Sequence, residues 1–195
     1  MNKNVGKVNY NKLDNEMILV EWVSGTKVKV YFPKYNSYTW TNHRAFKDGQ
    51  VKCKFEPRLY KVGYEGEGKY LMYEHGKRTF NYNKWCHILD RTHGGKHNKP
   101  CYKDVLLDEE WFNFQNFAEW NEANYYEIEG EEMHLDKDLL SEGVKIYSPN
   151  TCVYLPKRLN EVLATEDKEK IAEVLYNYKD LPKWIVELVE VRCEL

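Results

Sequence analysis

The sequence lacks the features that mark several large protein classes. No apolar run is long enough to cross a bilayer, and the polar start MNKNVGKVNYNK contains no signal-peptide core. Cysteine is sparse: there are five residues, an odd number, with no CxxC pair among them. Free thiols of this kind are typical of a reducing compartment. We therefore expect a cytoplasmic protein with no membrane partner.

A strong charge of one sign is also missing. The chain has 29 Lys and Arg against 31 Asp and Glu, a formal net charge of -2, so it has no overall basic field to attract nucleic acid. Any DNA contact must then come from a local patch, because neutralised phosphates supply most of the non-specific affinity. Aromatic residues make up 15% of the 195, which predicts a packed globular chain rather than a disordered one.

Alternating residues near the N-terminus predict a small antiparallel sheet. Residues Met17–Val23 and Lys27–Phe32 flank the turn Ser24-Gly25-Thr26 and read as a hairpin, Tyr38–Trp40 as a short third strand, and His43–Lys47 as a turn of helix. Lys27 and Lys29 give the hairpin one basic edge. That edge is either a solvated face that prevents aggregation or a contact for a nucleic-acid backbone.

Three glycines in Gly63–Tyr70 superficially suggest a phosphate loop. Their spacing is not that of a dinucleotide site, and no Gly-Lys-Ser or Gly-Lys-Thr follows, so a P-loop is excluded. Two acidic residues within the segment, Glu65 and Glu67, would also repel a bound phosphate. We expect a tight turn that joins the N-terminal sheet to the next part of the chain.

A helix is predicted over Tyr82–Asp90, followed by the polar loop Arg91–Cys101. Two hypotheses for the function of this region follow. One is a zinc site, whose ligands would be Cys86, His93, His97 and Cys101, with His87 as a spare. The other is a basic loop in which Arg91, Lys96 and Lys99 contact phosphates.

The segment that follows changes from aromatic to polar. Trp111, Phe114, Phe117 and Trp120 recur at helical spacing and predict an amphipathic helix over Trp111–Glu122 that packs on a core. Met133–Asp138 then alternates, so that on a strand His134, Asp136 and Asp138 would share one face. After a turn at Ser141–Gly143, Val144–Tyr147 reads as the second strand.

The end of the sequence predicts helices. Pro156–Asn160 suits a helix start with Pro near its first position. Thr165–Lys168 has the composition of a helix cap, and two apolar stripes at helical spacing follow, separated by Asp180-Leu181-Pro182. We expect a helical hairpin that packs on the body of the chain or binds a partner.

The run LDKDLLSEGVKIYSPNTCVYLPKRLN resembles a phage-encoded HNH (His-Me finger) homing-endonuclease-like family. Its members have a similar LDKD, then Lys-x-Tyr-Ser-Pro, Thr-Cys, an apolar pair, Pro and a late Asn. The resemblance extends back through WFNFQNFAEW to GYEGEGKY. Longer members of the family have an additional three-stranded DNA-reading domain before the tail, for which this chain has no room after Leu163.

The resemblance implies a ββα unit that holds one divalent cation, Mg²⁺ or Mn²⁺, beside a scissile phosphate. By position in the motif, His134 would be the general base and Asp136 a metal ligand, with Asn150 or Asn160 at the late Asn position. Lys157 and Arg158 would join Arg91, Lys96 and Lys99 on phosphates. The alternative is that His134 is a strand residue with an ordinary partner, and that Asp136 and Asp138 cap turns or pair with lysines.

Two functions from different classes follow. The first is an HNH-type, metal-dependent DNA endonuclease or nickase of a phage, or a degenerate relative of one, acting in the bacterial cytoplasm. The second is a catalytically silent anti-defence protein that binds a host nuclease such as a CRISPR effector; the exposed acidic stretch expected at Glu127–Glu132 would imitate DNA. A regulatory DNA-binding protein is a third, weaker reading. The sequence does not specify an oligomeric state.

These patterns together predict an α+β protein. A small N-terminal antiparallel sheet would occupy residues 1–62, a central ββα-like unit with flanking helices residues 63–164, and a C-terminal helical hairpin residues 165–195.

Overall fold

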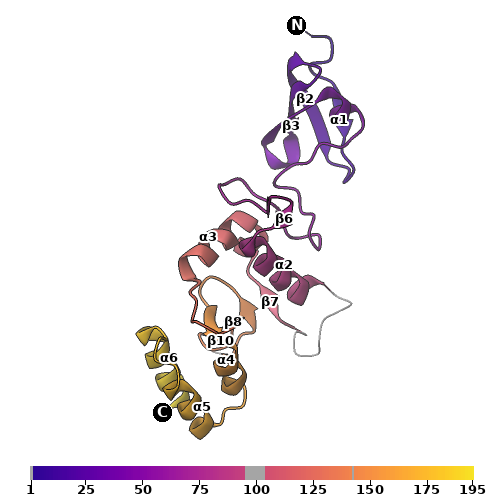
Figure 1. Cartoon of the computed structure of the whole chain (residues 1–195). Helices are drawn as coiled ribbons and strands as arrows, with labels where there is room; N and C mark the ends of the chain where they lie inside the picture. The colour runs from indigo at the N-terminus through magenta and orange to yellow at the C-terminus, as the bar shows by residue number, and fades with distance from the viewer. Residues whose placement is uncertain (1, 95–103, 142) are drawn as a thin grey trace. The chain divides into compact units, whose positions relative to one another are not determined.

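The computed structural model describes residues 2–94, 104–141 and 143–195 of the chain. Its helices and strands confirm the expected α+β class. Contacts group the chain into two units, Met1–Lys69 and Tyr70–Leu195 (Figure 1). Within the described ranges no helix is long and apolar enough to cross a membrane.

The first unit contains a four-stranded antiparallel sheet in the order β1-β2-β3-β4. Its elements are β1 Val8–Tyr10, β2 Glu16–Ser24, β3 Lys27–Phe32, η1 Pro33–Tyr35, β4 Ser37–Thr41 and α1 His43–Lys47. The predicted hairpin, third strand and short helix are therefore confirmed, and β1 is an addition. Alternation places Met17, Leu19, Val28, Val30 and Phe32 on the buried face.

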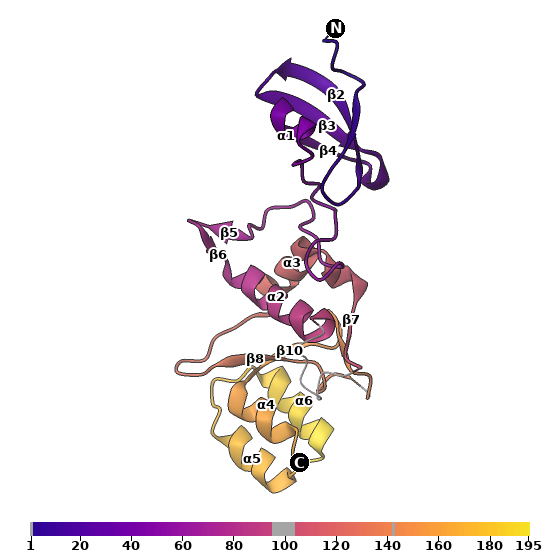
Figure 2. The same ribbon diagram turned by 90° about the vertical axis from the view of Figure 1, so that its right-hand side faces the viewer.

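Helix α1 packs on that buried face. Asn42 caps the helix by accepting a hydrogen bond from the Ala45 amide, and Phe46 is buried in the same cluster as the strand residues. Val51 and Cys53 complete the cluster after the chain turns. Among the described residues of this unit, α1 is the one α-helix, and it lies on one side of the sheet (Figure 2).

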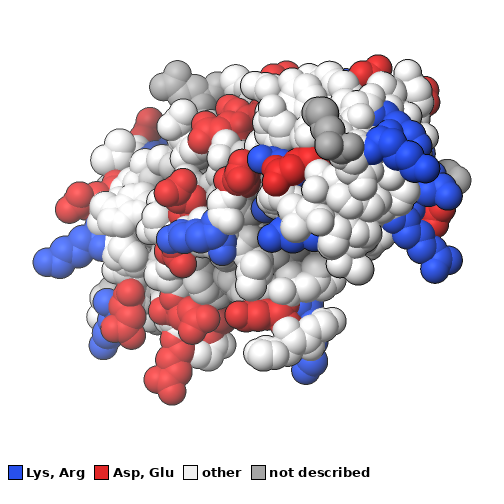
Figure 3. All heavy atoms as spheres, turned by 90° about the horizontal axis from the view of Figure 1, so that it is seen from above, with Lys and Arg blue, Asp and Glu red and all other residues white. Residues whose placement is uncertain are grey.

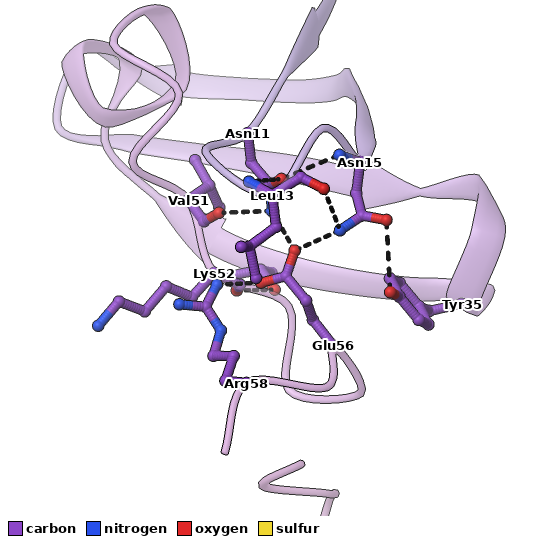
Figure 4. A network of polar contacts seen from close by, with 9 residues as sticks. Asn11, Leu13, Asn15, Tyr35, Val51, Lys52, Glu56 and Arg58 are labelled. Carbon is purple, nitrogen blue, oxygen red and sulfur yellow. Dashed lines mark hydrogen bonds and ion pairs between the residues drawn. The ribbon is translucent and has the colours of Figure 1, made fainter. Parts of the chain in front are cut away.

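A buried carboxylate joins two loops of the first unit. Glu56 is 1% exposed, and its Oε1 accepts hydrogen bonds from the side-chain amides of Asn11 and Asn15, while its Oε2 pairs with Arg58 (Figure 4). Asn15 also accepts a hydrogen bond from the Tyr35 hydroxyl. A carboxylate tolerates burial only when donors replace its lost water. Glu56 therefore holds the segment before β2 against the segment after α1.

The second unit has an aromatic core between two helices. Its first elements are β5 Tyr73–Glu74, β6 Lys77–Arg78, α2 Phe80–His93, β7 Leu106–Leu107, η3 Glu109–Phe112 and α3 Phe114–Asn124. Trp85, Trp111, Phe114 and Phe117 are fully buried, and the Trp85 indole donates to the Trp111 carbonyl oxygen at 2.7 Å. The predicted helix was wrong at its start. Asn113 has extended backbone and caps α3, so Trp111 lies in the preceding 3-10 turn.

The strands that follow pair differently from the prediction. β8 is Met133–Asp136, β9 is Ile146–Tyr147, and β10 is Val153–Pro156. Val144–Tyr147 was predicted to pair with the strand of His134. Instead β9 pairs in parallel with β7, and β8 pairs antiparallel with β10. All four β10 residues are buried, whereas Val144 and Lys145 are exposed, so burial favours β10 as the partner. Asp138 lies beyond the end of β8.

Helices complete the second unit: α4 Lys157–Leu163, α5 Lys168–Tyr176 and α6 Lys183–Cys193. The two tail helices confirm the predicted hairpin. Their buried residues Ile171, Val174, Ile185 and Val189 share one cluster with Leu155 of β10. The tail helices α5 and α6 therefore pack on β10, the strand that pairs with β8.

Charged side chains of both signs lie among one another on the face drawn in Figure 3. This mixed pattern agrees with the nearly balanced composition of 29 basic and 31 acidic residues.

The Glu56 network gives a stability prediction. Glu56→Ala leaves the amides of Asn11 and Asn15 and the charge of Arg58 without their buried acceptor, and we expect a loss of about 3 kcal/mol in the first unit. Amide hydrogen exchange of Leu19 and Val30 measures this unit by itself, and should accelerate on the order of 100-fold. Glu21→Ala, which removes an exposed carboxylate of β2, is the matched control. Equal exchange in the two variants would contradict the role given to Glu56.

Candidate functional site

The candidate site is built on β8, β10 and α4. In the register of the two strands His134 faces Leu155 and Met133 faces Pro156. α4 begins at Lys157, directly after β10, and the Lys157 amide donates to the Glu132 carbonyl oxygen at 2.8 Å. Leu159 and Val162 bury the apolar side of α4. The result is two antiparallel strands followed at once by a helix, which is the ββα order that the resemblance implies.

A cavity of about 1040 Å³ opens beside this unit. His134 and Asp136 of β8 and Asn160 of α4 all line it. Five basic residues also line it: Arg91, Lys137, Lys145, Lys168 and Arg192. Asp138, Glu166 and Glu194 add negative charge, and two of the ion pairs, Lys137 with Asp138 and Lys168 with Glu194, lie within the lining. The cavity is therefore large, polar and mixed in charge.

His134 has a carboxylate partner that the sequence prediction did not assign to it. The imidazole is 31% exposed, and its Nε2 lies 3.2 Å from Glu132 Oε1. Hydrogen bonds from His134 and then from Lys157 hold the pKa of Glu132 below its ordinary value, so the carboxylate is ionised and accepts only. With Glu132 as the acceptor, Nε2 is the donor of this contact, and Nδ1 is the other ring nitrogen of His134.

Asp136 has a structural task as well as a place in the cavity. Its Oδ1 accepts hydrogen bonds from the amides of Asp138 at 3.0 Å and Leu139 at 2.7 Å, which closes the turn after β8. Burial raises the pKa of the carboxyl group, and the amide of Leu139 opposes that effect. Both turn bonds use Oδ1. Asp136 thus closes the turn after β8 and also lines the cavity.

The two candidate asparagines lie in different places. Asn160 is half-buried in α4 and lines the cavity with His134 and Asp136. Asn150 is exposed in the turn after β9, where its backbone amide donates a hydrogen bond to Ser148 Oγ at 3.3 Å. His134, Asp136 and Asn160 therefore line the same cavity, and Asn150 does not.

The predicted phosphate contacts are also dispersed. Arg91 lines the cavity and donates to the Tyr147 hydroxyl at 3.3 Å. Lys157 pairs with Glu132 at 3.2 Å, and Arg158 lines a separate hollow of about 270 Å³ with Glu129 and Glu131. Lys96 and Lys99 lie outside the described residues.

The zinc reading stays a prediction, because His97 and Cys101 also lie outside the described residues. Of its other two ligands, Cys86 is buried in α2, and this burial raises the pKa of its thiol. His93 Nδ1 is 2.8 Å from the Thr92 hydroxyl. Across the part of the chain that the structure describes, no group of three or more His, Cys, Asp or Glu side chains is arranged to hold a metal.

A third, smaller cavity also has His134 in its lining. It measures about 200 Å³ and is lined by Lys84, His87 and Arg91 of α2 together with His134. These α2 positions are three and four residues apart, so they share one helix face. Lys84 donates to the Met133 carbonyl oxygen, and burial followed by the charge of Arg91 lowers the pKa of its amine. Lys84 was not predicted from the sequence as a site residue, although its helical spacing with His87 and Arg91 was visible.

Oxygen chemistry at the larger cavity suits a hard cation. Asp136 and Asn160 offer a carboxylate and an amide oxygen, and Mg²⁺ typically takes one or two carboxylates and keeps several waters. Asp136 and Asn160 are therefore the residues of this lining that would hold the metal that the resemblance implies. Comparisons of the chain with protein-family models, curated proteins and solved structures gave no match.

The two roles of Asp136 predict opposite effects of two substitutions on stability. Asp136→Asn keeps the Oδ1 acceptor and removes a charge that burial disfavours, so stability at pH 7 should be equal or higher. Asp136→Ala removes the acceptor of both amides and should cost about 1–2 kcal/mol. Amide exchange of Leu139 and Val153 measures both effects.

The same carboxyl group predicts a dependence on pH. The folded pKa is raised above the ordinary 3.8, so folding favours the protonated form, and its contribution to stability is lost as the pH rises from about 4 through the folded value. Asp136→Asn should lack this component. If the stability of the unmodified chain and of the Asp136→Asn variant fell equally over this pH range, Asp136 would not be the group responsible.

Proposed function

We propose that the chain is a divalent-metal-dependent DNA endonuclease or nickase of the HNH type. The observation that carries the proposal is that His134 and Asp136 of β8 and Asn160 of α4 line one cavity, in a unit where β8 pairs with β10 and α4 follows β10 directly. An imidazole, a carboxylate and an amide are the three side-chain chemistries that the resemblance assigns to such a unit. Asn160, not Asn150, takes the late position.

His134 acts on the attacking water. Glu132 accepts the Nε2 proton of the imidazole, so Nδ1 keeps a lone pair and takes a proton from water as its oxygen bonds to phosphorus. The bond from phosphorus to the O3′ leaving group breaks, and the departing oxygen receives a proton from solvent. Glu132 serves as a positioning residue, since it acts through His134 and not on the phosphate.

Asp136 and Asn160 would hold Mg²⁺ or Mn²⁺. When bound, such a cation neutralises charge on the scissile phosphate and on the departing oxygen. The turn bonds of Asp136 to Asp138 and Leu139 fix the carboxylate before any cation arrives, which lowers the entropic cost of binding. Asn160 is fixed in turn because the apolar side of α4 is buried.

The substrate class rests on the basic lining. Arg91, Lys145 and Arg192 line the cavity with the candidate catalytic group, and guanidinium and ammonium groups bind phosphate oxygens. In this proposal Lys157 contributes chiefly by pairing with Glu132, and Arg158 contacts the outer backbone. A phage enzyme of this kind would act on DNA in the cytoplasm of its bacterial host.

One observation favours the second candidate, a catalytically silent inhibitor of a host nuclease. Glu127, Glu129, Glu131 and Glu132 are all exposed in a short stretch next to β8, where they present the closely spaced negative charge of a nucleic-acid backbone. In this alternative the partner is a DNA-binding defence protein such as a CRISPR effector. Inhibition of the purified effector by a protein that does not nick DNA would favour this function over the first.

Plasmid nicking tests the nuclease directly. With Mg²⁺ or Mn²⁺ the purified chain should convert supercoiled plasmid to the nicked form, and EDTA should abolish the reaction. His134→Ala removes the general base and should slow nicking by about 100-fold or more. His75→Ala, at an exposed position in the β5–β6 turn, is the matched control and should nick normally. An active His134→Ala protein would show that the nuclease belongs to another site or to a contaminant.

The two asparagines give a separate prediction. Asn160→Ala should lose nicking and Asn160→Asp, which restores an oxygen donor, should recover part of it, while Asn150→Ala should behave as the unmodified chain. Rates measured over a range of Mn²⁺ concentrations distinguish a lost ligand from a lost fold, because a weakened ligand set is rescued by more metal. Loss of activity in Asn150→Ala alone would reverse the assignment.

A further inference from the structure

The basic charge of the chain is concentrated in its first unit. Residues 1–69 contain 13 Lys and Arg against 7 Asp and Glu, a formal net charge of +6. Residues 70–195 contain 16 against 24, a net charge of -8. One of the seven acids in the first unit is Glu56, which is buried and paired with Arg58. The overall charge of -2 therefore conceals a basic unit joined to an acidic one.

The first unit also presents aromatic rings to solvent on the face of its sheet opposite the buried face. Trp40 is 47% exposed and Tyr38 is 55% exposed, both on the edge strand β4. In the register of the sheet Lys29 is paired with Trp40 and Tyr31 with Tyr38, and the rings of Tyr31 and Tyr38 lie 4.7 Å apart. Since partners in register share a face, the four side chains form one continuous patch.

Lysine side chains lie directly over these rings. Lys27 Nζ is 5.1 Å from the centre of the Trp40 ring, and Lys29 Nζ is 4.9 Å from that of Tyr38 and 5.7 Å from that of Trp40. On β2, the acidic residue Glu21 lies opposite Lys29 in the strand register. The positive charge and the rings therefore gather toward the β4 edge. We call the side chains of Lys27, Lys29, Tyr31, Tyr38 and Trp40 the basic-aromatic face.

We propose that the basic-aromatic face binds single-stranded nucleic acid. Unpaired bases stack on exposed aromatic rings, and lysines beside the rings contact the phosphates that flank each stacked base. A duplex hides the faces of its bases, so exposed Trp40 and Tyr38 have no matching surface there except at a frayed or melted end. The +6 charge of the unit complements the polyanion and supplies the long-range attraction that the whole chain lacks.

This site is independent of the cavity at His134. The proposal needs no metal, and it holds for a nuclease, a silent inhibitor or a regulatory protein. Binding is therefore measured in EDTA with the full chain, by fluorescence anisotropy of a dye-labelled 20-nucleotide strand of mixed sequence. Competition with the unlabelled strand and with its duplex gives the preference, and His134→Ala should bind as the unmodified chain does.

A pair of tryptophans provides the matched test. Trp40→Ala should weaken binding about fivefold or more, because one stacked base is lost. Trp184→Ala removes a tryptophan of similar exposure, 53%, from α6 of the acidic unit, and should leave affinity unchanged. The double substitution Lys27→Ala and Lys29→Ala should reduce the slope of log Kd against log salt by about 1.4, at about 0.7 for each phosphate contact. Thermal unfolding by circular dichroism verifies that each variant is folded.

Three results would overturn the proposal. The first is no binding of the single strand by the folded chain at low salt. The second is equal affinity of the Trp40→Ala and Trp184→Ala proteins. The third is a preference for the duplex over the single strand, which would replace base stacking by backbone contact alone. Tighter binding of the single strand, lost in Trp40→Ala and retained in Trp184→Ala, is the result that we expect.

Discussion

The antiparallel pairing of β8 with β10 is the constraint on which the candidate site depends. It places His134 in register with Leu155, and α4 begins at Lys157, directly after the last residue of β10. All of β10 is buried, and it packs in the same apolar cluster as the tail helices. β8 is held in place by its hydrogen bonds to β10. His134, Asp136 and Asn160 consequently reach one cavity from elements that are held by packing rather than by the polar groups themselves.

The two units divide the electrostatics of the chain between them. The acidic second unit carries the candidate cleavage groups, where carboxylates suit a hard cation but repel a polyanion. The basic first unit carries lysines beside exposed aromatic rings, which suit a nucleic acid. Under the two proposals, the first unit binds nucleic acid and the second carries the chemistry at His134. The composition of the whole chain, close to neutral, hides this division.

Local patterns predicted the parts of the fold that local physics determines. Alternation gave β2 and β3, and helical spacing gave α2, α5 and α6, because each pattern reports burial of one face. The partner of β8 was missed because the turn at Ser141–Gly143 suggested a nearby hairpin, whereas the real pairing spans a longer loop and is decided by burial of β10. Pairing at a distance leaves little trace in adjacent residues. The same limit hid the contact between Glu132 and His134 and the burial of Glu56, although charge counted by unit would have revealed the basic first unit.

The central claim is that His134, Asp136 and Asn160 surround one cation. Histidine-labelled protein titrated with Mn²⁺ tests it most directly, because the paramagnetic ion broadens NMR signals of nuclei close to it. The account predicts that the His134 imidazole signal broadens at substoichiometric Mn²⁺ while that of His75, which is in the same unit and does not line the cavity, stays sharp, and that Asp136→Asn removes the effect. Uniform broadening of all histidines, or selective broadening that persists in Asp136→Asn, would contradict it.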